Sequence, residues 1–143
     1  MIRQPLVAFL PLLLTACTAT AAPSYPTVDD DPPAAAACDH VTRAAEEMVT
    51  EKKELATILH SRSAATRAGM SADPEIKASG GRLAAVAERA GDMLVHEKAS
   101  AAEMAPVRQE LGVAQQDLLA ACTDRFGPQP WAFRSGPEPA ASN

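Results

Sequence analysis

The sequence has few aromatic side chains, with one Trp, one Tyr and three Phe among its 143 residues. It also lacks runs of β-branched residues, and this absence argues against a β-sheet core. Its 13 Lys and Arg residues are outnumbered by 18 Asp and Glu residues, and they form no long basic run. Because binding to nucleic acid or electrostatic docking on anionic lipid needs clustered positive charge, neither is expected.

The motifs of common catalytic sites are missing as well. The chain has no Gly-x-Ser-x-Gly nucleophile elbow, and Gly80-Gly81 is not followed by the Gly-Lys-Ser/Thr of a phosphate loop. The acidic residues Glu46, Glu47, Glu51 and Glu54 lie near the pair Lys52-Lys53. Such a segment is typical of a solvated helix face rather than of a pocket. We therefore predict no catalytic residues and a protein that is not an enzyme.

The three histidines, His40, His60 and His96, form no metal-ligand pattern. His40 lies two residues after Cys38, but this pair lacks the second half of a zinc motif. We predict no metal site. The alternative is a metal or haem held between two helical arms by His60 and His96.

Residues 1–16 have the layout of an export signal. One positive side chain, Arg3, precedes an apolar stretch that runs from Leu6 to Leu14. This stretch is shorter than the roughly 20 apolar residues that span a bilayer, and Pro11 within it disfavours a spanning helix. We therefore predict a signal peptide rather than a transmembrane segment.

The apolar stretch ends in Leu14-Thr15-Ala16-Cys17. These residues resemble the lipobox of bacterial lipoprotein precursors, over about the first 18 residues of the chain. The resemblance implies that Cys17 receives a diacylglycerol, that a dedicated peptidase cuts before it, and that acyl chains such as palmitate anchor the protein to a membrane. It also implies a place in the cell envelope outside the cytoplasm. In a host with two membranes this would be the outer one, since Thr18 rather than Asp follows the cysteine. An ordinary signal peptide cut near Ala22 is the alternative.

Two segments are rich in Pro and small or polar residues, namely residues 18–33 and residues 127–143. Such segments cannot bury a core. We predict a disordered tether over residues 17–33, which includes the lipidated cysteine, and a disordered tail over residues 127–143. Residues 34–126 are then the folded domain.

This domain is dominated by good helix formers such as Ala, Leu, Glu and Arg. Val41, Met48 and Leu55 recur every seven residues, which predicts one amphipathic helix over residues 34–68. Asp73 and Pro74 have the order of an N-cap and a first-turn proline, which predicts a helix start.

A second heptad pattern follows in two phases. Its members are Leu83, Ala90, Met104, Leu111 and Leu118 in one phase, and Val86, Met93, Val107, Ala114 and Ala121 in the other. Ser100 and Glu103 have capping-box spacing, and Pro106 should break or kink a helix. The region is therefore one kinked helix or two helices that meet near residues 98–105. Its narrow, Ala-rich stripes predict close packing of coiled-coil type.

With Cys17 lipidated, Cys38 and Cys122 remain, and an even pair in an exported domain predicts a disulfide. Two free thiols are the alternative. The bond needs Cα atoms within roughly 7 Å, whereas an up-down-up bundle would separate them by a helix length of about 37 Å. A hairpin, or a bundle with an even number of helical arms, brings the two cysteines within this distance. Because residue 80 is the midpoint of the pair, we predict a turn at Gly80-Gly81, although the helix caps favour three arms.

Trp131, Phe133 and Arg134 lie together in the predicted tail. Aromatic and Arg side chains are favoured anchors in protein interfaces. We predict these residues as partner-binding. The alternative is a tail that folds back over the end of the bundle.

The sequence thus predicts an all-α protein, either an antiparallel helical hairpin or a small helical bundle, with a disordered tether and tail. The predicted function is that of a membrane-anchored envelope lipoprotein, without catalysis or a cofactor. It would act through contact with an envelope protein or through self-association. A ligand-binding helical module, with metal or haem, is the alternative.

Overall fold

The computed structural model describes residues 24–48 and 54–131. The expectations for the signal peptide, for Cys17, and for Phe133 and Arg134 lie outside these residues. Within them, the chain forms a short 3-10 helix and four α-helices and contains no strand, which confirms the all-α class. The elements are η1 (Val28–Asp30), α1 (Pro32–Met48), α2 (Glu54–Gly69), α3 (Pro74–Val95) and α4 (Ala101–Phe126).

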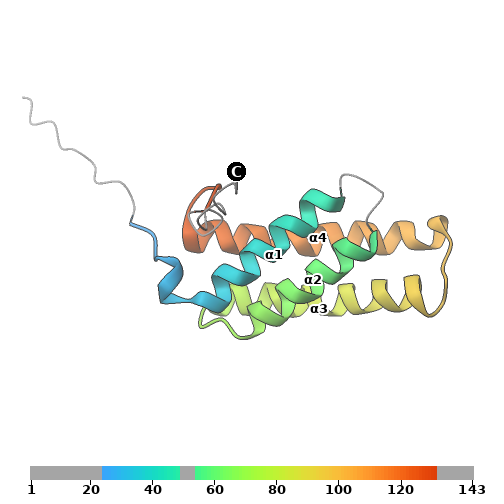
Figure 1. Cartoon of the computed structure of the whole chain (residues 1–143), viewed down its shortest axis with the longest axis horizontal. Coiled ribbons are helices and arrows are strands. Elements are labelled where there is room, and N and C mark those ends of the chain that lie inside the picture. The colour runs from blue at the N-terminus through green and yellow to red at the C-terminus, as the bar shows by residue number, and fades with distance from the viewer. Residues whose placement is uncertain (1–23, 49–53, 132–143) are drawn as a thin grey trace, which may run out of the picture.

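Each helix packs against the next one along the chain, and α4 returns to contact α1 (Figure 1). The result is a small helical bundle, which is one of the two predicted architectures. The helices α3 and α4 are longer than α1 and α2. They extend past the other two at the end of the molecule where α3 turns into α4 (Figure 1).

The start of α1 differs from the prediction, because the helix begins at Pro32 and not after a tether that ends at residue 33. Asp31 is buried, and its carboxylate accepts a hydrogen bond from the Ala34 N–H at 3.1 Å. Asp31 therefore caps α1, and proline is well suited to the first helical position because its missing N–H is not needed there. The same carboxylate accepts hydrogen bonds from the Ser71 hydroxyl at 2.8 Å and the Ala72 N–H at 3.0 Å, which fasten α1 to the turn between α2 and α3.

Two predicted helix starts are confirmed. The Asp73 carboxylate accepts hydrogen bonds from the Glu75 and Ile76 N–H groups at 2.9 and 3.1 Å, so Asp73 caps α3. Ser100 and Glu103 form a capping box at the start of α4. The second heptad region is therefore two helices, and α4 continues through Pro106.

The heptad positions of α3 and α4 form the core. All five residues of the first phase are buried, and so are the α4 members of the second phase, while Val86 and Met93 are partly buried against them. Small side chains supply much of the remaining interior, which brings the helices close together. One buried polar contact joins α2 to α4, where the Gln115 amide donates to the Ser61 hydroxyl at 2.9 Å. The predicted close, Ala-rich packing agrees with this core.

Two predictions about turns are wrong. The single helix expected over residues 34–68 is two helices, α1 and α2, that pack on each other. The turn expected at Gly80-Gly81 does not occur, because both glycines lie inside α3. A turn at the midpoint would require two arms of equal length, whereas the four described helices bring the cysteines together equally well.

The disulfide between Cys38 in α1 and Cys122 in α4 is formed, with Cα atoms 5.8 Å apart.

Near this disulfide, the segment that follows α4 packs onto the domain. Trp131 is 2% exposed, and its indole N–H donates to the Gly127 carbonyl at 2.7 Å. Gly127 has a φ of +82°, and the ring of Tyr25 lies against it. The part of the predicted tail up to Trp131 is therefore folded against the bundle.

Candidate functional site

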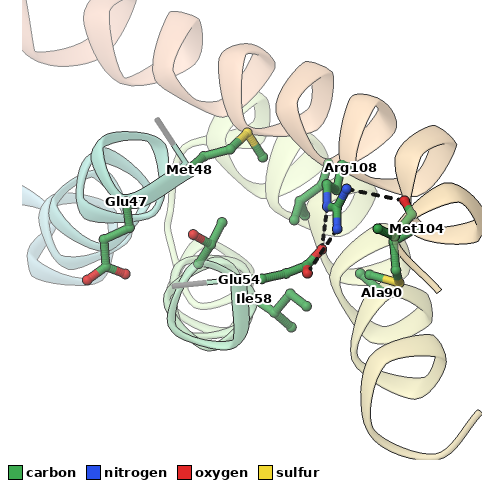
Figure 2. Close-up of a pocket in the computed structure, with 10 residues that line it drawn as sticks. Glu47, Met48, Glu54, Ile58, Ala90, Met104 and Arg108 are labelled. Atoms are coloured by element: carbon green, nitrogen blue, oxygen red, sulfur yellow. Dashed lines mark hydrogen bonds and ion pairs between the residues drawn. The ribbon is translucent and has the colours of Figure 1, made fainter. Parts of the chain in front are cut away.

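A cavity of about 450 Å³ lies at the end of the bundle where α1 ends and α2 begins. Ligand-binding pockets commonly have volumes of about 300–1,000 Å³, so this cavity is large enough for a small organic molecule. All four described helices contribute to its wall (Figure 2). The apolar part of the wall is formed by Met48, Ile58, Ala90, Met104 and Leu111.

The two methionines come from opposite sides of the cavity. Met48 is at the end of α1, and its sulfur lies close to Gly112 of α4, at 3.6 Å from the position that a Cβ atom would take there. Met104 belongs to the first turns of α4 and is 1% exposed. Methionine side chains are flexible and polarisable, and they adapt to guests of different shape.

An ion pair between α2 and α4 borders the cavity (Figure 2). The Arg108 guanidinium donates two hydrogen bonds to the Glu54 carboxylate, at 2.6 and 3.2 Å. It also donates to the Ala101 carbonyl at 3.3 Å. This bidentate geometry fixes the guanidinium plane better than a single contact would. Glu47 of α1 adds a second carboxylate to the lining.

Thr57 of α2 adds a buried polar group to the wall of the cavity. The residue is 3% exposed, and its hydroxyl has no hydrogen-bond partner. A buried hydroxyl without a partner costs free energy.

Next to the cavity, His60 of α2 contacts α1. Its ring centroid is 5.8 Å from that of His40, and its Nε2 is 3.8 Å from the Glu47 carboxylate. The ring contact of His60 is thus with His40, whereas His96 lies at the C-cap of α3, where its backbone N–H donates to the Asp92 carbonyl. Across residues 24–48 and 54–131, no three His, Cys, Asp or Glu side chains come together as a metal site.

The pKa of His40 lies below its ordinary value of 6.5. Burial of the imidazole is the largest cause, and its Nδ1 is buried without a hydrogen-bond partner. The carboxylate of Asp39 opposes this shift, while the charges of His60, Arg43 and Arg67 lower the pKa further.

This lowered pKa makes folding pH-dependent. As the pH falls through 6.5, unfolded His40 takes up a proton while folded His40 stays neutral. The unfolded state then binds more protons, so the free energy of unfolding should decrease with falling pH. Urea unfolding at several pH values measures this slope, and His40→Gln should make it shallower. An unchanged slope in His40→Gln would show that another group is responsible.

A second candidate site is an exposed apolar stripe, formed by Leu55 and Leu59 on the solvent side of α2 and by Met70 in the turn that directly follows the helix. These residues are 49%, 52% and 62% exposed. Leu55 and Leu59 share one side of the helix, because their spacing of 4 residues is close to one turn of 3.6 residues. We call this surface the α2 stripe. Arg62 and Arg67 of the same helix are exposed, and neither forms an ion pair with a described residue.

The structure changes the interpretation of several predicted residues. Trp131 is 2% exposed and packs in the core, so its indole does not lie on the surface of the described domain, and its role in partner binding stays a prediction. Leu55, predicted to lie on the apolar side of an amphipathic helix, is instead exposed. The cavity had no sequence signal, because Glu54 and Arg108 are 54 residues apart and belong to no motif.

No helix in the described part of the chain has the length and apolar character needed to cross a bilayer. No protein-family model, curated protein or solved structure matches this chain.

Proposed function

We propose that this protein is a lipid-anchored lipoprotein of the cell envelope that works, without catalysis, by binding a protein partner through the α2 stripe. The lipobox-like sequence that ends at Cys17 supports the anchor. The observation that supports binding is the exposure of Leu55 and Leu59 on one side of α2 and of Met70 in the turn directly after it. Neighbouring exposed apolar residues are typical of interaction surfaces.

The charges beside the stripe indicate the chemistry of the partner. The chain as a whole has a formal net charge of −5. By contrast, α2 carries Arg62 and Arg67, and its one acidic residue, Glu54, pairs with Arg108 on the cavity side. The solvent side of α2 is therefore a basic and apolar surface on an acidic protein. Its partner should present an apolar helix or groove flanked by carboxylates, since complementary charge guides association and selects partners.

A site-specific cross-linking experiment in the native envelope tests this proposal. A photoreactive amino acid at position 66, which is exposed on α2, should give one abundant adduct with an envelope protein. The same amino acid at position 116, exposed on α4, should not. Leu59→Glu should reduce the adduct at least about tenfold, because a buried carboxylate without a partner is costly at an interface. The matched control is Val113→Glu, at an α4 side chain that is 59% exposed, and it should leave the adduct unchanged.

The same cells test the anchor. Cys17→Ser should release the protein from the membrane fraction and remove its labelling by a palmitate analogue. Membrane retention of Cys17→Ser would refute the lipid anchor.

Equal adducts from positions 66 and 116, or an adduct that persists in Leu59→Glu, would refute the role of the α2 stripe. Adducts only between copies of this chain would replace the partner with self-association.

A further inference from the structure

Three segments of the chain meet at the end of the bundle opposite the turn between α3 and α4 (Figure 1). The ring of Tyr25 lies against Gly127, which joins the N-terminal segment to the end of α4. The Asp31 carboxylate accepts hydrogen bonds from Ser71 and Ala72, which join the same segment to the turn between α2 and α3. We call this end of the bundle the Tyr25 end, and it comprises residues 24–31, 67–77 and 123–131.

The Tyr25 end lies close along the chain to the proposed lipid anchor. Only six residues separate Cys17 from Ser24, the first described residue. Consecutive residues span at most about 3.6 Å in any conformation, so Ser24 lies within about 25 Å of the lipidated cysteine. The predicted tether, which ended at residue 33, would have allowed roughly 60 Å. The Tyr25 end is therefore the part of the described domain that is held nearest to the anchor.

Such a short connection strengthens any further contact between the domain and the membrane. A second contact made by an already attached molecule benefits from an effective concentration on the order of millimolar when the linker is short. A few exposed side chains, too weak to hold a free protein on a membrane, are then sufficient to hold an anchored one.

Two exposed side chains at the Tyr25 end suit the head-group region of a bilayer. Tyr25 is 43% exposed, and Met70, in the turn after α2, is 62% exposed. Tyrosine combines an apolar ring with a hydroxyl group, and it is enriched at membrane–water interfaces because it satisfies both surroundings. The two residues therefore offer apolar contact together with a polar group.

The charges at the Tyr25 end select the kind of lipid. Its exposed acidic residues are Asp29, Asp30, Glu75 and Asp124, and its exposed basic residues are Arg67 and Lys77. An anionic lipid surface attracts basic segments and repels acidic ones. A zwitterionic head group carries no net charge, and its cationic group is attracted by carboxylates.

We infer that the Tyr25 end docks on the zwitterionic lipid head groups of the membrane that holds Cys17, an inference that rests on the proposed lipid anchor.

This docking orients the domain and leaves the α2 stripe accessible. The helices α3 and α4 lead away from the Tyr25 end, so the turn between them points away from the membrane (Figure 1). Along α2, Leu55 lies about 21 Å from the end of the helix at Gly69. Leu55 and Leu59 therefore stay clear of the lipid and remain available to a protein partner.

The test uses the full lipidated chain in vesicles of phosphatidylcholine and phosphatidylethanolamine, with a photoreactive phenylalanine analogue at single positions. At position 25 the analogue replaces the tyrosine ring and should form adducts with lipid. At position 97, which is exposed beyond the end of α3, it should form at least about tenfold less lipid adduct, because the 22 residues of α3 add about 33 Å. Equal lipid adducts at the two positions would overturn the orientation, and no adduct at position 25 would overturn the docking.

A change of lipid charge tests the choice of head group. Replacement of half of the lipid by phosphatidylglycerol should lower the adduct at position 25 about fivefold, the effect expected for one charge near an anionic surface. Asp29→Lys should restore this adduct. The matched control is Glu97→Lys, at an exposed carboxylate of the opposite end, and it should not. A larger adduct with anionic lipid, or equal behaviour of the two variants, would overturn the assignment of zwitterionic lipid.

Failure of this inference differs from failure of the proposed function. If Cys17 carries no lipid, the protein should not enter the vesicle fraction, and the anchor and the docking would both be refuted. Vesicle-bound protein without lipid adducts at position 25 would overturn the docking alone. The protein adduct at position 66 tests the α2 stripe independently of both.

Discussion

Replacement of both disulfide cysteines, in Cys38→Ala/Cys122→Ala, is expected to lower the free energy of unfolding by about 4 kcal/mol. The bond joins residues 84 positions apart, and it closes most of the domain into one loop. Loop closure removes conformations from the unfolded chain, and the effect grows with loop length. Since small domains are stable by only about 5–15 kcal/mol, this loss is a large part of the total. Urea unfolding followed by circular dichroism measures the change.

The control for this prediction is Cys17→Ser, which leaves the loop intact and should unfold as the parent protein does. Both half-cystines are 0% exposed, so a reductant reaches them only after the domain opens. Reduction of the native protein should therefore be slow and should accelerate in urea. A change of less than about 1 kcal/mol on removal of both cysteines would mean that the packed helices restrict the chain without the bond.

Local sequence signals predicted much of this fold correctly. Asp73 and Ser100 mark helix starts by side-chain hydrogen bonds that depend on only a few neighbouring residues. The heptads of α3 and α4 identified core positions, because those helices pack lengthwise along most of their extent. The cysteine pair excluded an odd number of arms, since a covalent bond restricts topology independently of helix propensity.

The prediction failed where helix signals continued across a turn. Val41, Met48 and Leu55 keep heptad spacing over the break between α1 and α2, and no Gly or Pro marks that break. Because α2 begins as a separate helix, the directions of its side chains do not follow the heptad phase of α1. Val41 is consequently 0% exposed and Leu55 is 49% exposed.

The candidate sites could not be predicted from the sequence, for related reasons. The cavity depends on how far α3 and α4 extend past α1 and α2, and this offset depends on turn positions that the sequence did not reveal. Trp131 was assigned to a disordered tail because Pro and Gly surround it, yet one aromatic ring buried over the end of the bundle folds that segment. Composition describes a segment alone and does not include the surface on which it packs.

Gly80 and Gly81 were predicted to form a turn, and the structure gives them opposite roles within α3. A Cβ atom at Gly80 would overlap the Cβ of Ala68, so α2 and α3 approach each other closely at this point. A Cβ atom at Gly81 would meet nothing within 4 Å. Gly80→Ala should lower the free energy of unfolding by about 1–3 kcal/mol, the cost of overpacking. The adjacent control, Gly81→Ala, should raise it by about 0.5–1 kcal/mol, because alanine restricts the unfolded chain and favours helix.

A double-mutant cycle identifies the cause of the Gly80 effect. Ala68→Gly removes the methyl group that a Cβ at position 80 would meet, and by itself it should be destabilising because glycine weakens a helix. Combined with Gly80→Ala it restores one methyl group between the helices. The double variant should therefore be more stable than the sum of the two single changes predicts, by at least about 0.5 kcal/mol. Strict additivity of the two changes in unfolding free energy would mean that the helices do not approach closely at Gly80. Steric contact with Ala68 would then not explain the glycine at this position.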